Sequence, residues 1–235
     1  IAVDYAGHPA DWSALRYLAD RYHLHLVNDA CHSLGASYRG NYSYAAEYAD
    51  AVALSFHPVK VITCGEGGSI LSNNSEIIQR VRQLRDHGII RNRKELEEYR
   101  GPWSYEMHAL GFNYRLPDIS CALGASQLTK LNYFVSARRK IAESYSTLLE
   151  NNCDVLLPDE NIEVTHAYHL YPVQMDFDEK RVSKNQLFQE LTTQGIKLQV
   201  HYIPIHTQPY YKKRFGSDWG DFPHAEQFFH RVVSL

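Results

Sequence analysis

Two polar segments in the first part of the chain hold residue types that could carry chemistry. The first is NDACH, residues 28–32, and the second is SFHPVK, residues 55–60; each directly follows an apolar run. In open α/β sheets, ligands bind beyond the carboxyl ends of the strands. The Asp29 carboxylate and the Lys60 amine are therefore candidate site groups, and the glycines of GEGG, residues 65–68, follow closely.

Each of these features also has a purely structural interpretation. Asp29 could cap the next helix, Lys60 could be one surface lysine among many, and the glycines could form only a turn. The residue types of either segment, taken alone, leave both interpretations open.

The sequence around both segments predicts helices that alternate with short strands. Asp11 can cap a helix with apolar residues at helical spacing through Tyr22, and another helix opens at Ser75 and ends at Gly88. Four continuous apolar runs are typical of buried strands, namely residues 1–5, 25–27, 50–56 and 68–71. The pattern predicts an α/β fold with a mainly parallel sheet that helices cover on both faces.

The pattern changes after residue 90. Residues 91–105 are polar, which predicts a long surface excursion, and a helix is expected to start at Pro117. The further elements that we predict are a helix at 134–150, a strand at 166–175, a helix at 183–194 and a strand at 197–202.

We place a domain boundary near residue 150. Residues 1–150 would belong to a large domain, and residues 151–235 to a smaller C-terminal α/β domain. The chain starts inside an apolar run without a methionine, and it stops at Leu235 without a closing helix. We therefore expect this sequence to be part of a longer protein, with both domains incomplete.

The composition argues against several classes of partner. The chain has 235 residues, 44% of them hydrophobic, and a formal net charge of -3, so it has no surplus of positive charge for nucleic acid. Its four cysteines form no CxxC pair, which predicts neither a metal site nor a disulfide framework and fits a reducing compartment. No apolar run approaches the roughly 18 to 20 residues of a membrane span. We expect a cytoplasmic protein without a membrane partner.

Three longer strings resemble a known family. LVNDACHSLGASYRG, SFHPVKVITCGEGGSILSN and LGFNYRLPDISCALGASQLTKL are similar, in order and approximate spacing, to the DegT/DnrJ/EryC1/StrS family of sugar aminotransferases. The similarity covers the whole chain. The strings GPWSYEMHALGFNYRL and QVHYIPIHTQPYY are most similar to the branch that aminates UDP-linked sugars in pseudaminic acid synthesis.

The resemblance implies a fold and a cofactor. The fold is type I of the pyridoxal-phosphate-dependent transferases, similar to aspartate aminotransferase, with a large domain and a smaller C-terminal domain. The N-terminal part of the family's large domain is absent from this sequence, together with its phosphate-cradling loop and its stacking aromatic residue. The cofactor would be pyridoxal 5'-phosphate.

The resemblance also assigns cofactor-binding residues. Lys60 matches the catalytic lysine that carries the cofactor, and Asp29 matches the carboxylate that keeps the pyridine nitrogen protonated. His32 matches a position near the ring hydroxyl, although a histidine satisfied in the core remains an alternative. Ser55 matches a serine that reaches the phosphate, and Asn113 an asparagine that reaches the phosphate from the neighbouring subunit. A homodimer with shared active sites is therefore implied.

Four further residues are candidates for substrate binding: Arg115, His201, Tyr202 and His206. The last three lie in a string that resembles the family's nucleotide-sugar segment. Each also has a structural alternative, because an arginine at a helix start is often a solvated charge and a histidine or tyrosine at a strand end is often structural.

The implied function is transfer of an amino group from L-glutamate to C4 of a UDP-linked 4-keto-6-deoxy-N-acetyl hexose. Another 4-keto nucleotide sugar, of the 4-amino-4-deoxy-arabinose or perosamine type, is an alternative substrate, and a non-catalytic binding module with the same fold is an alternative function. A dehydratase branch of the family carries a histidine at the lysine position, so Lys60 argues against it. A Rossmann dehydrogenase is disfavoured because no GxGxxG follows a predicted strand.

Overall fold

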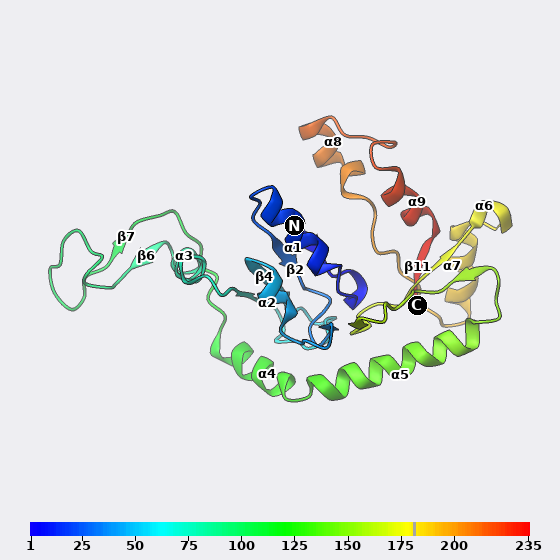
Figure 1. Cartoon of the computed structure of the whole chain (residues 1–235), viewed down its shortest axis with the longest axis horizontal. Coiled ribbons are helices and arrows are strands. Elements are labelled where there is room, and N and C mark those ends of the chain that lie inside the picture. The colour runs from blue at the N-terminus through cyan, green and yellow to red at the C-terminus, as the bar shows by residue number, and fades with distance from the viewer. Residues whose placement is uncertain (181) are drawn as a thin grey trace. The chain divides into compact units, whose positions relative to one another are not determined.

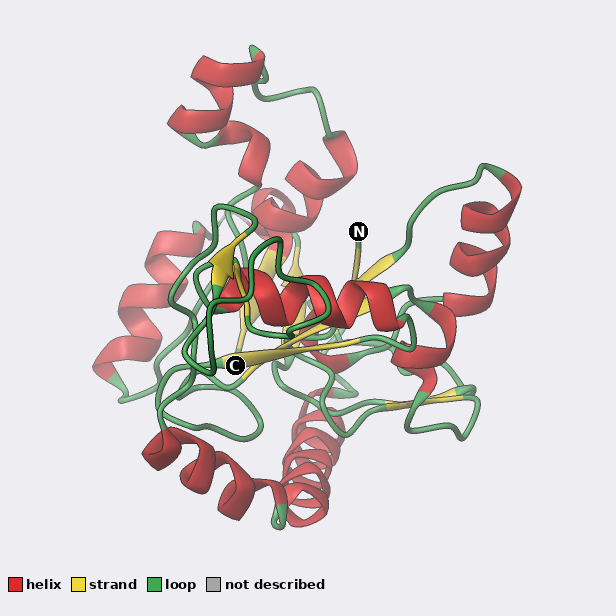
Figure 2. Ribbon diagram, turned by 90° about the vertical axis from the view of Figure 1, so that its left-hand side faces the viewer, coloured by secondary structure: helices red, strands yellow, loops and turns green. Residues whose placement is uncertain are grey.

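The computed structural model describes residues 1–180 and 182–235, and the chain forms two compact units (Figure 1). Unit 1 comprises Ile1–Ser136 and Ile162–Ala167. Unit 2 comprises Ala137–Asn161 and Tyr168–Leu235. In both units the helices and short strands are joined by long irregular segments (Figure 2).

The units divide inside the long helix α5, Leu131–Leu149. The domain boundary that we predict near residue 150 lies just after this helix. Residues 162–167 return to unit 1 because β9, Val164–Thr165, pairs antiparallel with β3, Ser37–Tyr38. This pairing joins segments that are far apart in the sequence, and no local pattern predicts it.

Unit 1 contains a four-stranded sheet with the strand order β1-β2-β4-β5. The strands are β1 Ala2–Val3, β2 Val27–Asp29, β4 Ala51–Ser55 and β5 Gly68–Leu71. The first three run parallel, and β5 pairs antiparallel with β4. The predicted α/β fold with a mainly parallel sheet is confirmed.

Two details of this sheet differ from the prediction. β1 is an edge strand with an exposed Val3, so it is not buried as its apolar sequence indicated. β2 begins only at Val27, although the preceding residue is also hydrogen-bonded to Asp50. The Asp50 carboxylate accepts a hydrogen bond from Leu26 N at 2.7 Å, and Asp50 N donates to Leu26 O at 2.8 Å.

The helices of unit 1 that pack near this sheet begin at polar caps or short turns. They are α1 Trp12–Arg21, α2 Tyr44–Tyr48 and α3 Ser75–Arg85, with the short helix η1 Tyr5–Gly7 after β1. Asp11 caps α1 as predicted, since its Oδ1 accepts from Ala14 N at 3.1 Å. Asn74 caps α3, so Ser75 is its first helical residue.

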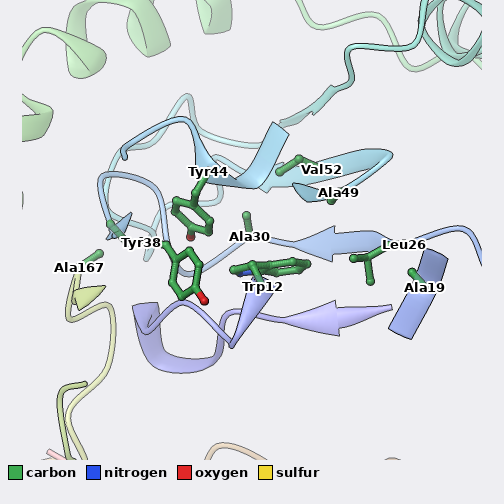
Figure 3. Packing of buried hydrophobic residues seen from close by; sticks show 10 residues of the cluster. Trp12, Ala19, Leu26, Ala30, Tyr38, Tyr44, Ala49, Val52 and Ala167 are labelled. Atoms are coloured by element: carbon green, nitrogen blue, oxygen red, sulfur yellow. The ribbon is translucent and has the colours of Figure 1, made fainter. Parts of the chain in front are cut away.

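A buried cluster covers one face of the sheet. Trp12 is fully buried at its centre, between Tyr38 and Tyr44 on one side and Leu26 on the other (Figure 3). Burying a large apolar side chain of this kind contributes about 1.5 to 3 kcal/mol. Val52 of β4 joins the same cluster, which anchors the strands that precede both candidate segments.

The middle of the chain forms a hairpin and two helices. β6, Ile89–Ile90, pairs antiparallel with β7, Glu106–Met107, and the hairpin projects from the sheet of unit 1 (Figure 1). The polar segment 91–105, predicted as a surface excursion, connects the two strands of this hairpin. The helix α4, Asp118–Leu128, starts one residue later than predicted, because Pro117 has extended backbone angles and serves as the N-cap.

Unit 2 is built on a three-stranded antiparallel sheet with the order β11-β10-β8. Its strands are β8 Val155–Leu156, β10 Pro172–Met175 and β11 Val232–Ser234. Its helices are α6 Phe177–Lys180, α7 Lys184–Thr193, η2 Ile205–Thr207, α8 Pro209–Phe215 and α9 Pro223–Arg231.

The helix prediction in unit 2 is confirmed, but of the predicted strand 166–175 only Pro172–Met175 forms β10, and a second strand prediction is wrong. Ser183 caps α7 in a capping box with Gln186, and Gly195 follows with a φ of 82°. Residues 197–202 form no strand, because only Gln199 bridges to Ser234. In the described part of the chain, no helix has the length and apolar character that a bilayer crossing requires.

Candidate functional site

The candidate groups lie where parallel strands of unit 1 end. β1, β2 and β4 run in the same direction, so their carboxyl ends meet at one edge of the sheet. Asp29 is the last residue of β2, and Ser55 is the last residue of β4. Lys60 follows in the turn after β4. This is the edge at which open α/β sheets bind ligands.

The strand register places Asp29 and Ser55 on the same face of the sheet. Asp29 is the register partner of Ala53, and Ser55 lies two residues beyond Ala53 on β4. Side chains alternate between the faces with a period of two, so Asp29, Ala53 and Ser55 share one face. Asn28 and Val52 belong to the opposite face, which carries the buried cluster around Trp12.

Lys60 is a half-buried amine beside this edge. Its backbone N–H donates to His57 O at 2.9 Å, which closes the turn after β4. Burial lowers the pKa of the Lys60 amine below its ordinary value, and electrostatic interactions with Cys31 and Asp29 partly oppose this shift. Lys60 is therefore within electrostatic reach of the Asp29 segment, although the two segments are separate in the sequence.

Cys31 is a neighbour that the sequence argument did not select. Burial, with a smaller contribution from Asp29, raises the pKa of its thiol to about 12. The group is therefore a neutral thiol at pH 7, and Asp29 supplies the negative charge that Lys60 senses. Cys31 N also donates to Asp29 Oδ1 at 3.2 Å and so orients the carboxylate.

The glycines after Lys60 permit close packing beneath the turn. A Cβ on Gly68 would lie 2.5 Å from Leu54 O, and one on Gly67 would lie 2.7 Å from Cys64 Sγ. Phe56 N donates to Gly67 O at 2.8 Å, which ties the glycines to the start of the Lys60 turn. Their first role is to let the chain at the start of β5 approach β4 closely.

His32 is buried near the same edge. Its ring centroid lies 6.4 Å from that of Tyr5, which follows β1 in the helix η1. Ser55 Oγ accepts from His57 N at 3.4 Å, a long contact that leaves the hydroxyl proton available to a ligand.

The segment around Asn113 lies on an exposed part of unit 1. Phe112 and Tyr114 stack with ring centroids 4.8 Å apart, and Arg115 forms an ion pair with Asp86. Within the described residues, no hydrogen bond or ion pair joins Asn113 or Arg115 to Asp29, Ser55 or Lys60. Within the single chain, Asn113 instead forms an antiparallel bridge with Asp86, just after α3.

The remaining candidates belong to unit 2. His201 Nδ1 lies 2.9 Å from Ser234 Oγ, and its ring meets that of Tyr202 edge-on at 4.8 Å. Both line a recess of about 350 Å³ together with Gln199, Val200, Ile203 and Gln208.

His206 has a different environment. Its Nε2 lies 2.8 Å from Glu226 Oε1, and the two side chains are only 10% and 12% exposed. Glu226 also accepts hydrogen bonds from Gly220 N and Phe222 N. These bonds connect η2 with the start of α9.

Comparison with known proteins finds structural neighbours over almost the whole chain. Over 99% of this chain, the structure of *Helicobacter pylori* PseC, described as an aminotransferase involved in the biosynthesis of pseudoaminic acid, matches with a TM-score of 0.88 and 29% identity. The PLP form of Spr1654 from *Streptococcus pneumoniae* matches over the same share with a TM-score of 0.86 and 26% identity. This chain covers 59% and 61% of those two chains, respectively.

A curated sequence relative agrees. The UDP-4-amino-4,6-dideoxy-N-acetyl-beta-L-altrosamine transaminase of Campylobacter jejuni serotype O:23/36 is 38% identical over an alignment of 236 positions, which covers 99% of this chain and 58% of that protein. The chain thus spans about three-fifths of the length of such relatives. The model of the DegT/DnrJ/EryC1/StrS aminotransferase family matches residues 1–235. This match over the whole chain, together with the fold and the sequence relative, shows that the chain belongs to the DegT/DnrJ/EryC1/StrS aminotransferase family.

Proposed function

We propose that the protein containing this chain is a pyridoxal-phosphate-dependent nucleotide-sugar aminotransferase. The observation that carries the proposal is Lys60, a half-buried amine with a lowered pKa at the edge where Asp29 and Ser55 share one face. A perturbed amine beside a carboxylate at this edge is typical of a functional site.

The residues at this edge fit pyridoxal phosphate. The cofactor needs an amine for its aldehyde, a carboxylate for its pyridine nitrogen and hydrogen-bond donors for its phosphate. Lys60, Asp29 and Ser55 supply these three kinds of group from neighbouring strand ends. When bound, the cofactor supplies an electron sink for negative charge that develops at the amino-bearing carbon.

Lys60 and Asp29 have complementary roles in this proposal. Because the pKa of the Lys60 amine is lowered, a larger fraction of Nζ is neutral near pH 7 than in an ordinary lysine. Neutral Nζ can take a proton from the amino-bearing carbon and return one to the product. The Asp29 carboxylate would keep the pyridine nitrogen protonated, and the hydrogen bond from Cys31 N–H orients this carboxylate for the contact.

The substrates are proposed from the relatives. The *C. jejuni* relative is named for a UDP-linked amino sugar, and PseC is described by pseudoaminic acid biosynthesis. A UDP-linked 4-keto-6-deoxy-N-acetyl hexose is therefore the proposed amino acceptor, with L-glutamate as the donor. His201 and Tyr202, which line a recess of unit 2, remain candidates for contacts with the nucleotide sugar.

A homodimer with shared sites completes the proposal. Asn113 is exposed, and apolar neighbours around it are exposed too: Leu110 by 88% and Tyr114 by 71%. Clustered exposed apolar side chains of this kind favour an interface. We propose that Asn113 reaches the cofactor phosphate of the partner subunit.

Spectroscopy of the protein at its full natural length tests the function. Reconstitution with pyridoxal phosphate should produce a visible absorption band, L-glutamate should bleach it, and a UDP-linked 4-keto sugar should restore it with formation of an amino sugar. A mass spectrum of the product identifies the aminated sugar. A protein whose visible band does not respond to any amino donor would contradict the proposal.

A further inference from the structure

Asp4 is a buried carboxylate that the proposed chemistry does not use. It follows β1 directly, and its side chain is fully buried. Its two oxygens accept five hydrogen bonds, from Ala10 N at 2.9 Å, Trp12 Nε1 at 2.9 Å, Asn28 Nδ2 at 3.1 Å, Ser33 Oγ at 2.8 Å and Tyr44 OH at 2.6 Å.

Every partner of this carboxyl group can act as a hydrogen-bond donor. The amide and indole contacts are N–H donors, and the two hydroxyls can donate as well, so none of the five partners requires a proton on Asp4. No ion pair to Asp4 occurs in the part of the chain that the structure describes, so these hydrogen-bond donors satisfy its buried oxygens. Burial, with the charge of Asp4, raises the pKa of Tyr44 and keeps the phenol proton in place.

Asp4 contacts the Asp29 segment at three points. Asp4 N donates to Asp29 O at 3.1 Å, while the carboxylate accepts from Asn28 and from Ser33. Residues 28 and 33 bracket Asp29, Cys31 and His32. Asn28 points to the face of the sheet opposite to Asp29, so Asp4 holds the segment from behind and does not reach the ligand face.

We infer that Asp4 is a positioning residue that sets the location of the Asp29 carboxylate by holding both ends of segment 28–33. This inference rests on the proposed function, because Asp29 is the group that is to meet the pyridine nitrogen. A displacement of about 1 Å in such a group can lower a rate by about 100-fold. Asp4 would therefore affect the reaction without touching cofactor or substrate.

A double-mutant cycle at Asp4 and Asp29 tests the inference. In the full-length holoenzyme, Asp4→Asn should lower the limiting rate constant of the L-glutamate half-reaction by about 10- to 100-fold and leave the glutamate dissociation constant within about twofold. In the Asp29→Ala background, the same substitution should change that rate constant by less than about twofold. Equal losses in both backgrounds would overturn the inference.

Hydrogen exchange of the cofactor-free protein gives a second readout. Asp4→Asn should speed amide exchange in peptides that cover residues 28–33 by about tenfold or more, relative to peptides of α3. Trp12→Phe is the matched control, because it removes one donor to Asp4 from α1 and leaves the bonds to Asn28 and Ser33. It should lower the melting temperature without the same change in the half-reaction rate constant.

The possible outcomes separate this inference from the proposed function. If Asp4→Asn does not fold, Ser33→Ala removes a single hydroxyl donor and should lower the rate constant by about threefold or more, again only when Asp29 is present. Wild-type protein that binds pyridoxal phosphate but responds to no amino donor would defeat the proposed function. The hydrogen-exchange measurement would then decide the role of Asp4. Unchanged amide exchange of residues 28–33 in Asp4→Asn would overturn the inference.

Discussion

Lys60 in unit 1 and His206 in unit 2 are both partly enclosed polar side chains, but their environments differ. The Lys60 amine donates no hydrogen bond to any residue that the structure describes, and burial lowers its pKa. His206 is hydrogen-bonded to Glu226, and Glu226 accepts further hydrogen bonds from backbone N–H groups. Lys60 therefore keeps its bonding capacity for a ligand, whereas His206 uses at least part of its capacity to stabilise unit 2.

The two environments distinguish residues that the family resemblance alone had both assigned to the site. An amine that lies near a carboxylate and has no hydrogen-bond partner of its own is available to react with a ligand. A histidine with a buried carboxylate partner is first a structural element, because breaking that bond leaves a buried polar group unsatisfied. Substitutions at the strand-end site should thus reduce turnover, and substitutions at His206 should reduce stability.

The largest effect is expected for Lys60→Ala. Loss of the amine should lower turnover by more than about 10⁴-fold, because the same Nζ both anchors the cofactor and moves the proton. The fold should persist, since Lys60 makes no side-chain hydrogen bond to the described residues. Borohydride reduction of the wild-type holoenzyme, followed by peptide mapping, should place the pyridoxyl group on Lys60. A map that places it on another lysine would refute this assignment.

Asp29→Ala should have the next largest effect. The variant should still bind cofactor, but its glutamate half-reaction should slow by about 10²- to 10³-fold, because the pyridine nitrogen loses its anionic partner. Stopped-flow absorbance measures this rate constant. Asp29→Asn is the matched control, since it keeps the shape and removes the charge. Near-normal kinetics in both variants would show that Asp29 is not the nitrogen partner.

Asn113→Ala should weaken cofactor retention by about tenfold. A hydrogen bond to a charged acceptor contributes about 1.5 to 3 kcal/mol, which corresponds to this loss or more. Equilibrium dialysis measures the dissociation constant of pyridoxal phosphate. Mixing Lys60→Ala with Asn113→Ala subunits should restore some activity, because one hybrid site then carries neither lesion. Absence of recovery, with exchange of subunits confirmed by mass, would place Asn113 outside the shared site.

The smallest effect on catalysis is expected at His206. His206→Ala should lower the free energy of unfolding by about 1 to 3 kcal/mol, because Glu226 loses a buried partner. The sugar KM should change less than about threefold. Urea denaturation and steady-state kinetics measure the two quantities. A raised KM with unchanged stability would instead support a contact between His206 and the substrate. The same two measurements on His201→Ala, which alters the recess of unit 2, serve as the comparison.

Local sequence patterns determined several elements of this protein. Asp11 caps α1 and Ser183 caps α7 as predicted, because a short polar side chain before an apolar periodic run satisfies free N–H groups locally. β5 matches its predicted range, and the polar residues after two apolar runs do lie at the ends of β2 and β4. The resemblance of the strings around Lys60 led to the correct family.

Only the tertiary structure decided what these local elements do together. Strand 197–202 was predicted from its apolar residues, but only Gln199 finds a partner, at Ser234, and a strand needs a neighbour along its length. The common face of Asp29 and Ser55 depends on the register between β2 and β4. The partners of Asp4 come from three separate parts of the chain, so no spacing rule links them. Apolar periodicity is a local signal, whereas the neutralisation of a buried charge depends on which distant donors the fold brings to it.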